Sequence, residues 1–116
     1  MKYILILIAA LSLGACRSLQ SVTYIEPAQA FSLGEGRHGS YVANIQNIGP
    51  EDIEVLVRQP DSQVVSLGLL QKAGKGHYDV PANTQVIFKN TSEARQGIIQ
   101  IRLKGDTDLS MGYIRE

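Results

Sequence analysis

The feature that most constrains the fold is the alternation of apolar and polar residues from residue 22 onward. In segment 97–104, Ile99, Ile101 and Leu103 occupy one face of an extended strand, while polar and basic residues occupy the other. A period of two residues is typical of a half-buried β-strand. Turn residues interrupt the pattern about every ten residues, as in an all-β sandwich or barrel.

Nine segments show this pattern, so the sequence predicts an all-β fold, a single small antiparallel β-sandwich of about eight or nine strands. In 63–70 the adjacent Val64 and Val65 break the alternation, so we expect a bulge there or burial on both faces. The core should be mostly aliphatic, because the chain has no tryptophan. The nine segments are 22–25, 28–33, 41–46, 53–59, 63–70, 77–80, 84–90, 97–104 and 109–114.

Residues 1–15 form a different kind of segment. Lys2 is followed by a stretch, 3–13, that is apolar except for Ser12. An apolar stretch of about 7–15 residues after a positive start is typical of a secretory signal, and a transmembrane helix needs ~20 apolar residues. We therefore expect residues 1–15 to be a helical signal peptide that is removed.

The apolar stretch ends in Leu13-Gly14-Ala15-Cys16, and Cys16 is the only cysteine. This sequence resembles the lipobox of bacterial lipoprotein precursors. The resemblance implies that a diacylglyceryl group is transferred to the Cys16 thiol and that the chain is cleaved between Ala15 and Cys16. Two alternatives are an ordinary secretory signal cleaved after Ala15 and a buried, inert cysteine. Cys16 has no disulfide partner within the chain.

The lipobox divides the chain into a signal peptide (1–15), a lipidated cysteine with a short tether (16–21) and a β-sandwich domain (22–116). Several acyl chains would anchor the protein stably, because a single chain binds a membrane only marginally. The tether residues after Cys16 reach at most ~17–18 Å, so the domain should lie close to the membrane. Arg17 rather than aspartate follows Cys16, which favours the outer membrane by resemblance to the Gram-negative sorting pattern.

Segment 78–90 resembles extracytoplasmic immunoglobulin-like sandwiches. Its Val-Pro-Ala-Asn-Thr sequence is followed by a hydrophobic strand and then by Asn90. Segment 41–57, with Asn47 and Gly49 in its turn, is similar. This generic resemblance supports the fold class and transfers no function.

The charge of the chain excludes one class of partner. Eleven basic and eleven acidic residues give a net charge of zero and a pI near 6.7. A nucleic-acid-binding domain usually has a pI above about 9. We therefore expect no nucleic-acid partner and no general affinity for polyanions. Lipid rather than charge should supply the membrane affinity.

One glycine-rich segment matches the G-x-G-x-x-G pattern of dinucleotide-binding loops. In such loops a strand leads into a helix whose N-terminus meets the pyrophosphate. Here segment 34–39 is followed by a strand-like run, so no helix end is available. We interpret it as a flexible loop whose glycines adopt positive φ, with Arg37 and His38 at its tip as a candidate contact surface.

No cofactor or metal is expected. Besides Cys16, the soft or borderline metal ligands are His38, His77 and Met111. A blue copper site requires a thiolate, which an acylated Cys16 cannot supply. A Cu(I) site built from the two histidines and Met111 is the remaining alternative.

We expect no enzymatic activity. The sequence contains no nucleophile-elbow pattern, and its carboxylates are scattered through turns. Glu51, Asp52 and Glu54 form a small acidic group whose default role is a solvated edge. The sequon at Asn90 carries no meaning in a bacterium. Paired carboxylates brought together only in space are an open alternative.

Three functional hypotheses follow. The first is a membrane-anchored, non-catalytic bacterial lipoprotein that serves as an envelope or cell-surface accessory and binds a protein or glycan partner. The second is a carrier of a small apolar ligand in a β-barrel or sandwich cavity, and the third is an enzyme. An edge strand able to pair with a partner favours the first, and a large apolar cavity favours the second.

Overall fold

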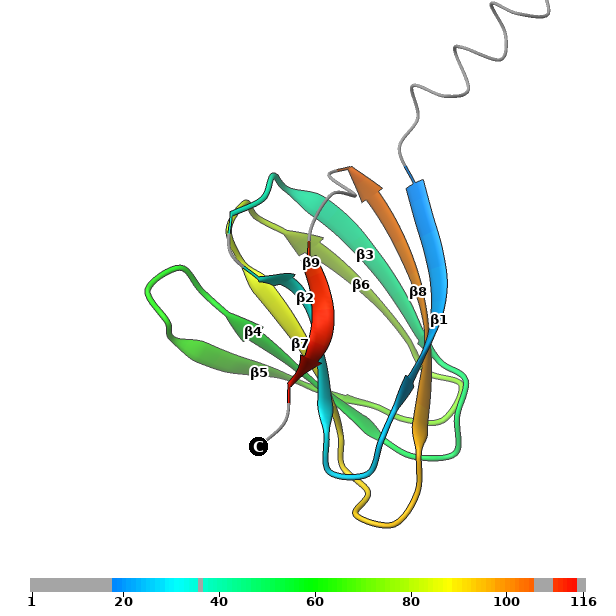
Figure 1. The fold of residues 1–116 in the computed structure, drawn as a ribbon. Coiled ribbons are helices and arrows are strands. Elements are labelled where there is room, and N and C mark those ends of the chain that lie inside the picture. The colour runs from blue at the N-terminus through cyan, green and yellow to red at the C-terminus, as the bar shows by residue number, and fades with distance from the viewer. Residues whose placement is uncertain (1–17, 36, 106–109, 115–116) are drawn as a thin grey trace, which may run out of the picture.

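The structure is a computed structural model that describes residues 18–35, 37–105 and 110–114. These residues form nine β-strands arranged in two antiparallel sheets (Figure 1). The prediction of an antiparallel β-sandwich of eight or nine strands is confirmed. The predicted signal-peptide helix, the cleavage site at Ala15 and the lipidation site Cys16 lie outside the described residues. None of the described residues belongs to a helix that could span a bilayer.

The four-stranded sheet has the order β1–β8–β3–β6, and the five-stranded sheet has the order β5–β4–β7–β2–β9. All neighbouring strands are antiparallel. Among the described strands, β1 and β6 are therefore the edges of one sheet, and β5 and β9 are the edges of the other. The strands are β1 (Ser18–Ile25), β2 (Ala30–Glu35), β3 (Tyr41–Asn47), β4 (Ile53–Arg58), β5 (Val64–Leu70), β6 (Lys75–Val80), β7 (Gln85–Asn90), β8 (Gly97–Gly105) and β9 (Ser110–Ile114).

The alternation of the sequence determines which face of each strand is buried. In β8, Ile99, Ile101 and Leu103 are completely buried, whereas Arg102 and Lys104 are exposed. Strands β3 and β4 bury alternate residues in the same way. Successive side chains of a strand point to opposite faces of the sheet, so the residues predicted to face inward form the core.

The core lies between the two sheets and receives side chains from both. It is mostly aliphatic, as predicted, and Phe88 is its largest fully buried side chain. Burying one such side chain stabilises the fold by about 1.5–3 kcal/mol relative to exposure. The buried cluster contains Ile25, Phe31, Leu33, Tyr41, Ala43, Ile45, Ile53, Val55, Leu70, Val80, Val86, Phe88, Ile99, Ile101 and Leu103.

Strand β1 begins earlier than the sequence indicated. The predicted strand began at Val22, but β1 begins at Ser18, which pairs with Lys104. Segment 18–21 is polar apart from Leu19, and it becomes a strand because the long β8 offers backbone groups for pairing along its whole length. The predicted tether of residues 16–21 is therefore wrong from Ser18 onward, since these residues belong to the sheet.

A buried asparagine, Asn90, hydrogen-bonds the loops together at the end of the sandwich opposite the start of β1. The side-chain amide of Asn90 donates to the carbonyl oxygens of Ile25 (3.0 Å) and Arg95 (2.8 Å). Asn47 is equally buried and has a similar role at the end of β3, where it donates to the carbonyl of Leu70 (2.8 Å). The sequon at Asn90 is therefore inaccessible in the folded protein, because this side chain is 1% exposed.

Candidate functional site

Strand β5 is an unpaired edge of the five-stranded sheet. It pairs with β4 on one side, and no described strand pairs with its other side (Figure 1). Backbone N–H and C=O groups along that other side are available to a further strand. An edge of this kind is a template to which another chain can add.

Strand β5 also concentrates exposed aliphatic side chains. Val64, Val65, Leu67 and Leu69 are between 42% and 54% exposed. We call these four residues the β5 apolar edge. The described part of the chain has ten large exposed hydrophobic residues, so this one strand carries four of them. A contiguous apolar patch on the surface marks an interaction site more often than scattered residues do.

A β-bulge places these side chains on both faces of β5. Val55 pairs with Gly68 and Leu56 pairs with Ser66, so Leu67 is the extra residue. Gly68 has φ +107°, a conformation that side-chain-bearing residues rarely adopt. The predicted bulge is confirmed, whereas the predicted alternative of burial on both faces is wrong. The aliphatic residues of this edge remain exposed.

Strand β6, the edge of the four-stranded sheet, has a different surface. Lys75, His77 and Asp79 are all exposed on it. The Nδ1 atom of His77 lies 2.6 Å from Oδ1 of Asn44, and its Nε2 atom lies 3.6 Å from Oδ1 of Asp79. Charged residues on an edge strand discourage pairing with another chain. The apolar β5 is therefore the better candidate for a protein-binding edge.

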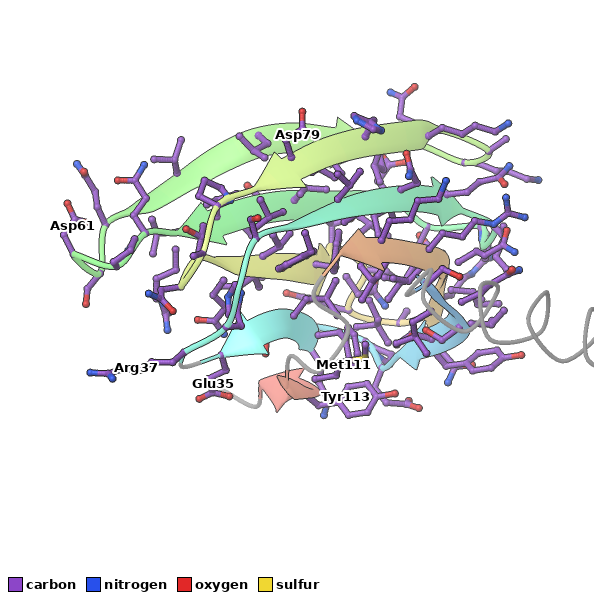
Figure 2. The ribbon with its side chains drawn as sticks, turned by 90° about the horizontal axis from the view of Figure 1, so that it is seen from above. Glu35, Arg37, Asp61, Asp79, Met111 and Tyr113 are labelled. Atoms are coloured by element: carbon purple, nitrogen blue, oxygen red, sulfur yellow. The ribbon has the colours of Figure 1, made fainter. Side chains whose placement is uncertain are left out.

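The two residues predicted at the tip of the candidate contact loop, Arg37 and His38, have different environments. Arg37 is exposed and projects from the body of the domain (Figure 2). His38 is instead held in place, because its Nδ1 and Nε2 atoms lie 2.6 Å and 2.9 Å from the carbonyl oxygens of Gly39 and Thr84. The loop joins strand β2 to strand β3, and Gly34 has the predicted positive φ (+80°). Arg37 remains a candidate contact residue, and His38 positions the loop.

Tyr41, beside this loop, is buried, and Tyr78 on β6 is half-buried. Tyr41 packs against the His38 ring and is 3% exposed. Burial raises the pKa of the Tyr41 hydroxyl. It also raises the pKa of the Tyr78 hydroxyl, which is less deeply buried. The Tyr41 hydroxyl has no hydrogen-bond partner among the described residues. Both phenols therefore stay neutral at physiological pH.

The candidate metal ligands are not brought together. His38 lies in the loop between β2 and β3, whereas His77 lies beside Asp79 on β6. Met111 lies on β9, at the side of the sandwich opposite Asp79 (Figure 2). Within the described ranges, no three His, Cys, Asp or Glu residues are close enough to hold one metal ion. The Cu(I) alternative thus finds no support in the geometry.

The hollows of the domain bear on the carrier hypothesis. Three hollows of about 320, 380 and 340 Å³ are open to solvent. Polar and charged residues make up most of the lining of the first and the third, and the third contains Arg37 and Arg58. The space between the sheets is filled by the core cluster. A carrier of an apolar molecule needs an enclosed, mostly apolar cavity, and these hollows do not have that form.

Comparison with known proteins supports the fold. No family model matches the chain, and no curated protein matches it. It is similar to the solved structure of procruciferin, an 11S globulin from Brassica napus, with 14% identity, a TM-score of 0.53, and coverage of 83% of this chain and 23% of that one. It is also similar to PliG from Aeromonas hydrophila, a periplasmic inhibitor of g-type lysozyme, with 12% identity, a TM-score of 0.50, and coverage of 84% of this chain and 90% of that one.

The chain is also similar to the solved structure of a pumpkin pro-11S globulin, with 12% identity, a TM-score of 0.53, and coverage of 83% of this chain and 23% of that one. The chain thus spans less than a quarter of each seed globulin. At these identities the likeness shows that the β-sandwich fold is shared. The functional argument rests on the residues of this chain.

Proposed function

We propose that this protein is a small bacterial lipoprotein, anchored to the cell envelope by acyl chains on Cys16, whose β-sandwich is a non-catalytic module that binds a protein partner. The anchor rests on the Leu13-Gly14-Ala15-Cys16 sequence. The observation that carries the binding function is the β5 apolar edge, four exposed aliphatic side chains on a strand that pairs with β4 on one side and with no described strand on the other. Arg17 favours the outer membrane if the cell is Gram-negative.

The start of β1 supports a position close to the membrane. Arg17 is the one residue between Cys16 and β1 in the sequence. A residue spans at most ~3.6 Å, so the lipidated cysteine and the first strand are separated by a few ångströms of chain. The start of β1 would therefore face the lipid, and a partner at β5 would be held near the membrane surface.

Strand addition is the binding mode that β5 favours. A partner segment would pair with the free backbone groups and place apolar side chains against Val65 and Leu69. The bulge at Leu67 interrupts regular pairing, so it restricts which segments fit. The free edge and the bulge together favour binding of one specific partner over association with any exposed strand edge.

The likeness to PliG supports this proposal in one respect. PliG is described as a periplasmic inhibitor of g-type lysozyme, and the likeness extends over 90% of its chain. A sandwich of this size can thus be an extracytoplasmic protein whose task is to bind another protein. The carrier hypothesis remains the alternative, but none of the three hollows formed by the described residues is the enclosed apolar cavity that would favour it.

Mass spectrometry of the mature protein extracted from membranes tests the anchor. We expect an N-terminal peptide that begins at Cys16 and carries the mass of a diacylglyceryl group. A Cys16→Ala variant should lose both the lipid and processing by the lipoprotein pathway. An unmodified N-terminus at Cys16, or an uncleaved chain, would contradict the proposal.

Affinity capture after crosslinking in the intact envelope tests the binding function. The protein crosslinked to the wild type should be recovered in much lower yield with Leu67→Ser. The matched control is Ile48→Ser in the loop between β3 and β4, because Ile48 is 45% exposed and Leu67 is 50% exposed. Equal recovery with both variants would show that β5 does not carry the interaction.

A further inference from the structure

The outer face of the four-stranded sheet carries a second organised surface. Directly paired residues of antiparallel strands lie on the same face. One row across this face therefore contains Gln20, Arg102, Asn44 and His77, from β1, β8, β3 and β6 respectively. The adjacent row contains Val22, Gln100, Gln46 and Lys75. We call these two rows the amide-basic face.

The charges on this sheet are unequal although the whole chain is neutral. Strands β1, β3, β6 and β8 contain the cations Lys75, Arg102 and Lys104 but one carboxylate, Asp79. Asp79 lies on edge strand β6, where its carboxylate is 3.6 Å from Nε2 of His77. The net charge of zero suggested no affinity for anions. The fold nevertheless places these three cations on one sheet.

A hollow of about 320 Å³ lies in the amide-basic face. Apart from Ile45 and Gly76, the residues that line it carry amides, cations or an imidazole, and no carboxylate lines it. Amides both donate and accept hydrogen bonds, while Lys and Arg donate only. The hollow therefore matches a ligand that combines hydroxyl groups with negative charge. Its polar lining residues are Asn44, Gln46, Lys75, His77, Gln100 and Arg102.

An exposed aromatic ring borders the same face. Tyr24 of β1 pairs with Ile98 of β8, so its side chain points outward on the side of Val22 and Gln100. It is 51% exposed. Four strands at a spacing of ~4.8 Å span about 14 Å from β1 to β6, which is longer than one sugar ring. A saccharide chain could thus contact Tyr24 and the basic residues together.

We propose that the amide-basic face binds an acidic polysaccharide of the envelope. Arg102 and Lys75 contact carboxylates of the saccharide, and Asn44 and Gln100 hydrogen-bond its hydroxyl groups. Tyr24 packs against the apolar face of a sugar ring. The site lies on a different sheet from the β5 apolar edge, so the polysaccharide and the protein partner bind independently.

Calorimetric titration of the mature full-length protein in detergent tests this proposal, with a galacturonate hexamer as the probe. We expect the hexamer to bind and to bind more weakly as the salt concentration rises. A neutral glucose hexamer should bind much more weakly. Arg102→Gln should weaken galacturonate binding about tenfold, because a charge-assisted hydrogen bond is lost.

Matched variants separate this site from other surfaces. Arg58→Gln removes an exposed arginine from the other sheet and should leave binding unchanged. Tyr24→Ser should weaken binding, whereas Tyr113→Ser, on a ring that is 53% exposed on β9, should not. Leu67→Ser should also bind normally, so failure of the β5 proposal would not affect this result.

Four results would overturn the proposal. The first is the absence of galacturonate binding, and the second is equal binding of the neutral hexamer. The third is binding of a single-stranded oligonucleotide at least as tightly as galacturonate, which would indicate a nucleic-acid site. Wild-type affinity in Arg102→Gln would equally exclude the amide-basic face as the site.

Discussion

Strands β5 and β7 belong to the same sheet and have similar apolar sequences, but they have opposite exposures. β7 lies at the centre of the sheet, and Val86, Ile87 and Phe88 are buried. β5 lies at the edge, and Val64 and Leu67 are about half exposed. A local apolar pattern therefore specifies a strand, while its place in the sheet determines whether the side chains stabilise the core or meet a partner.

The largest expected effect is on the centre of the sheet. Phe88→Ala should lower the free energy of unfolding by about 3–5 kcal/mol, because it leaves a cavity in a fully buried site. Urea denaturation followed by circular dichroism measures the change. A loss below about 1 kcal/mol would mean that β7 is not the centre of the core.

The end of β7 should show the next largest effect. Asn90→Ala removes the donor that pairs with the carbonyls of Ile25 and Arg95, and we expect a loss of about 1–3 kcal/mol. Asn90→Asp keeps the oxygen that accepts from the Ser92 N–H but removes the amide donor. It should therefore also destabilise the protein in urea denaturation. Wild-type stability in Asn90→Asp would show that the donor is unimportant.

The bulge of β5 is tested by Gly68→Ala. An added Cβ meets no atom within 4 Å, so any loss of stability comes from φ +107° alone. We expect about 1–2 kcal/mol, comparable to placing a side chain in a left-handed conformation. Gly112→Ala is the matched control, because Gly112 also has open space but no positive φ. Equal thermal stability of the two variants would contradict the bulge geometry.

The apolar edge itself should contribute little to stability. The double variant Leu67→Ser and Leu69→Ser should change the free energy of unfolding by no more than about 1 kcal/mol, because both side chains are half exposed. Its capture of the crosslinked partner should nevertheless fall sharply. A loss of stability like that of Phe88→Ala would show that β5 is part of the core.

The sequence predicted the fold well because periodicity is a local property. Alternation in 97–104 and 41–46 correctly identified the buried faces of β8 and β3. The adjacent Val64 and Val65 indicated a bulge in this segment, although the extra residue is Leu67 and the two valines pair regularly with β4. The position of Gly34 at a positive φ followed from the glycine-rich loop. Each of these features depends on neighbours within a few residues.

The candidate site was less predictable because it depends on which strands are neighbours. Nothing local distinguishes an apolar edge strand from an apolar central strand, so the exposure of Leu67 and Leu69 was not foreseen. The pairing of Ser18 with Lys104 and the grouping of Lys75 with Arg102 likewise join distant segments. The lengths of the turns between strands are the sequence signal from which the order of strands in each sheet, and so its edge strands, could have been inferred.

Photocrosslinking in intact cells provides the most direct test that β5 binds a protein. A photoreactive residue is placed at position 67 on the apolar edge or at position 79 on the charged edge strand β6. We predict a discrete protein adduct from position 67 and none from position 79. No adduct from position 67, or equal adducts from both positions, would contradict a partner-binding role for the β5 apolar edge.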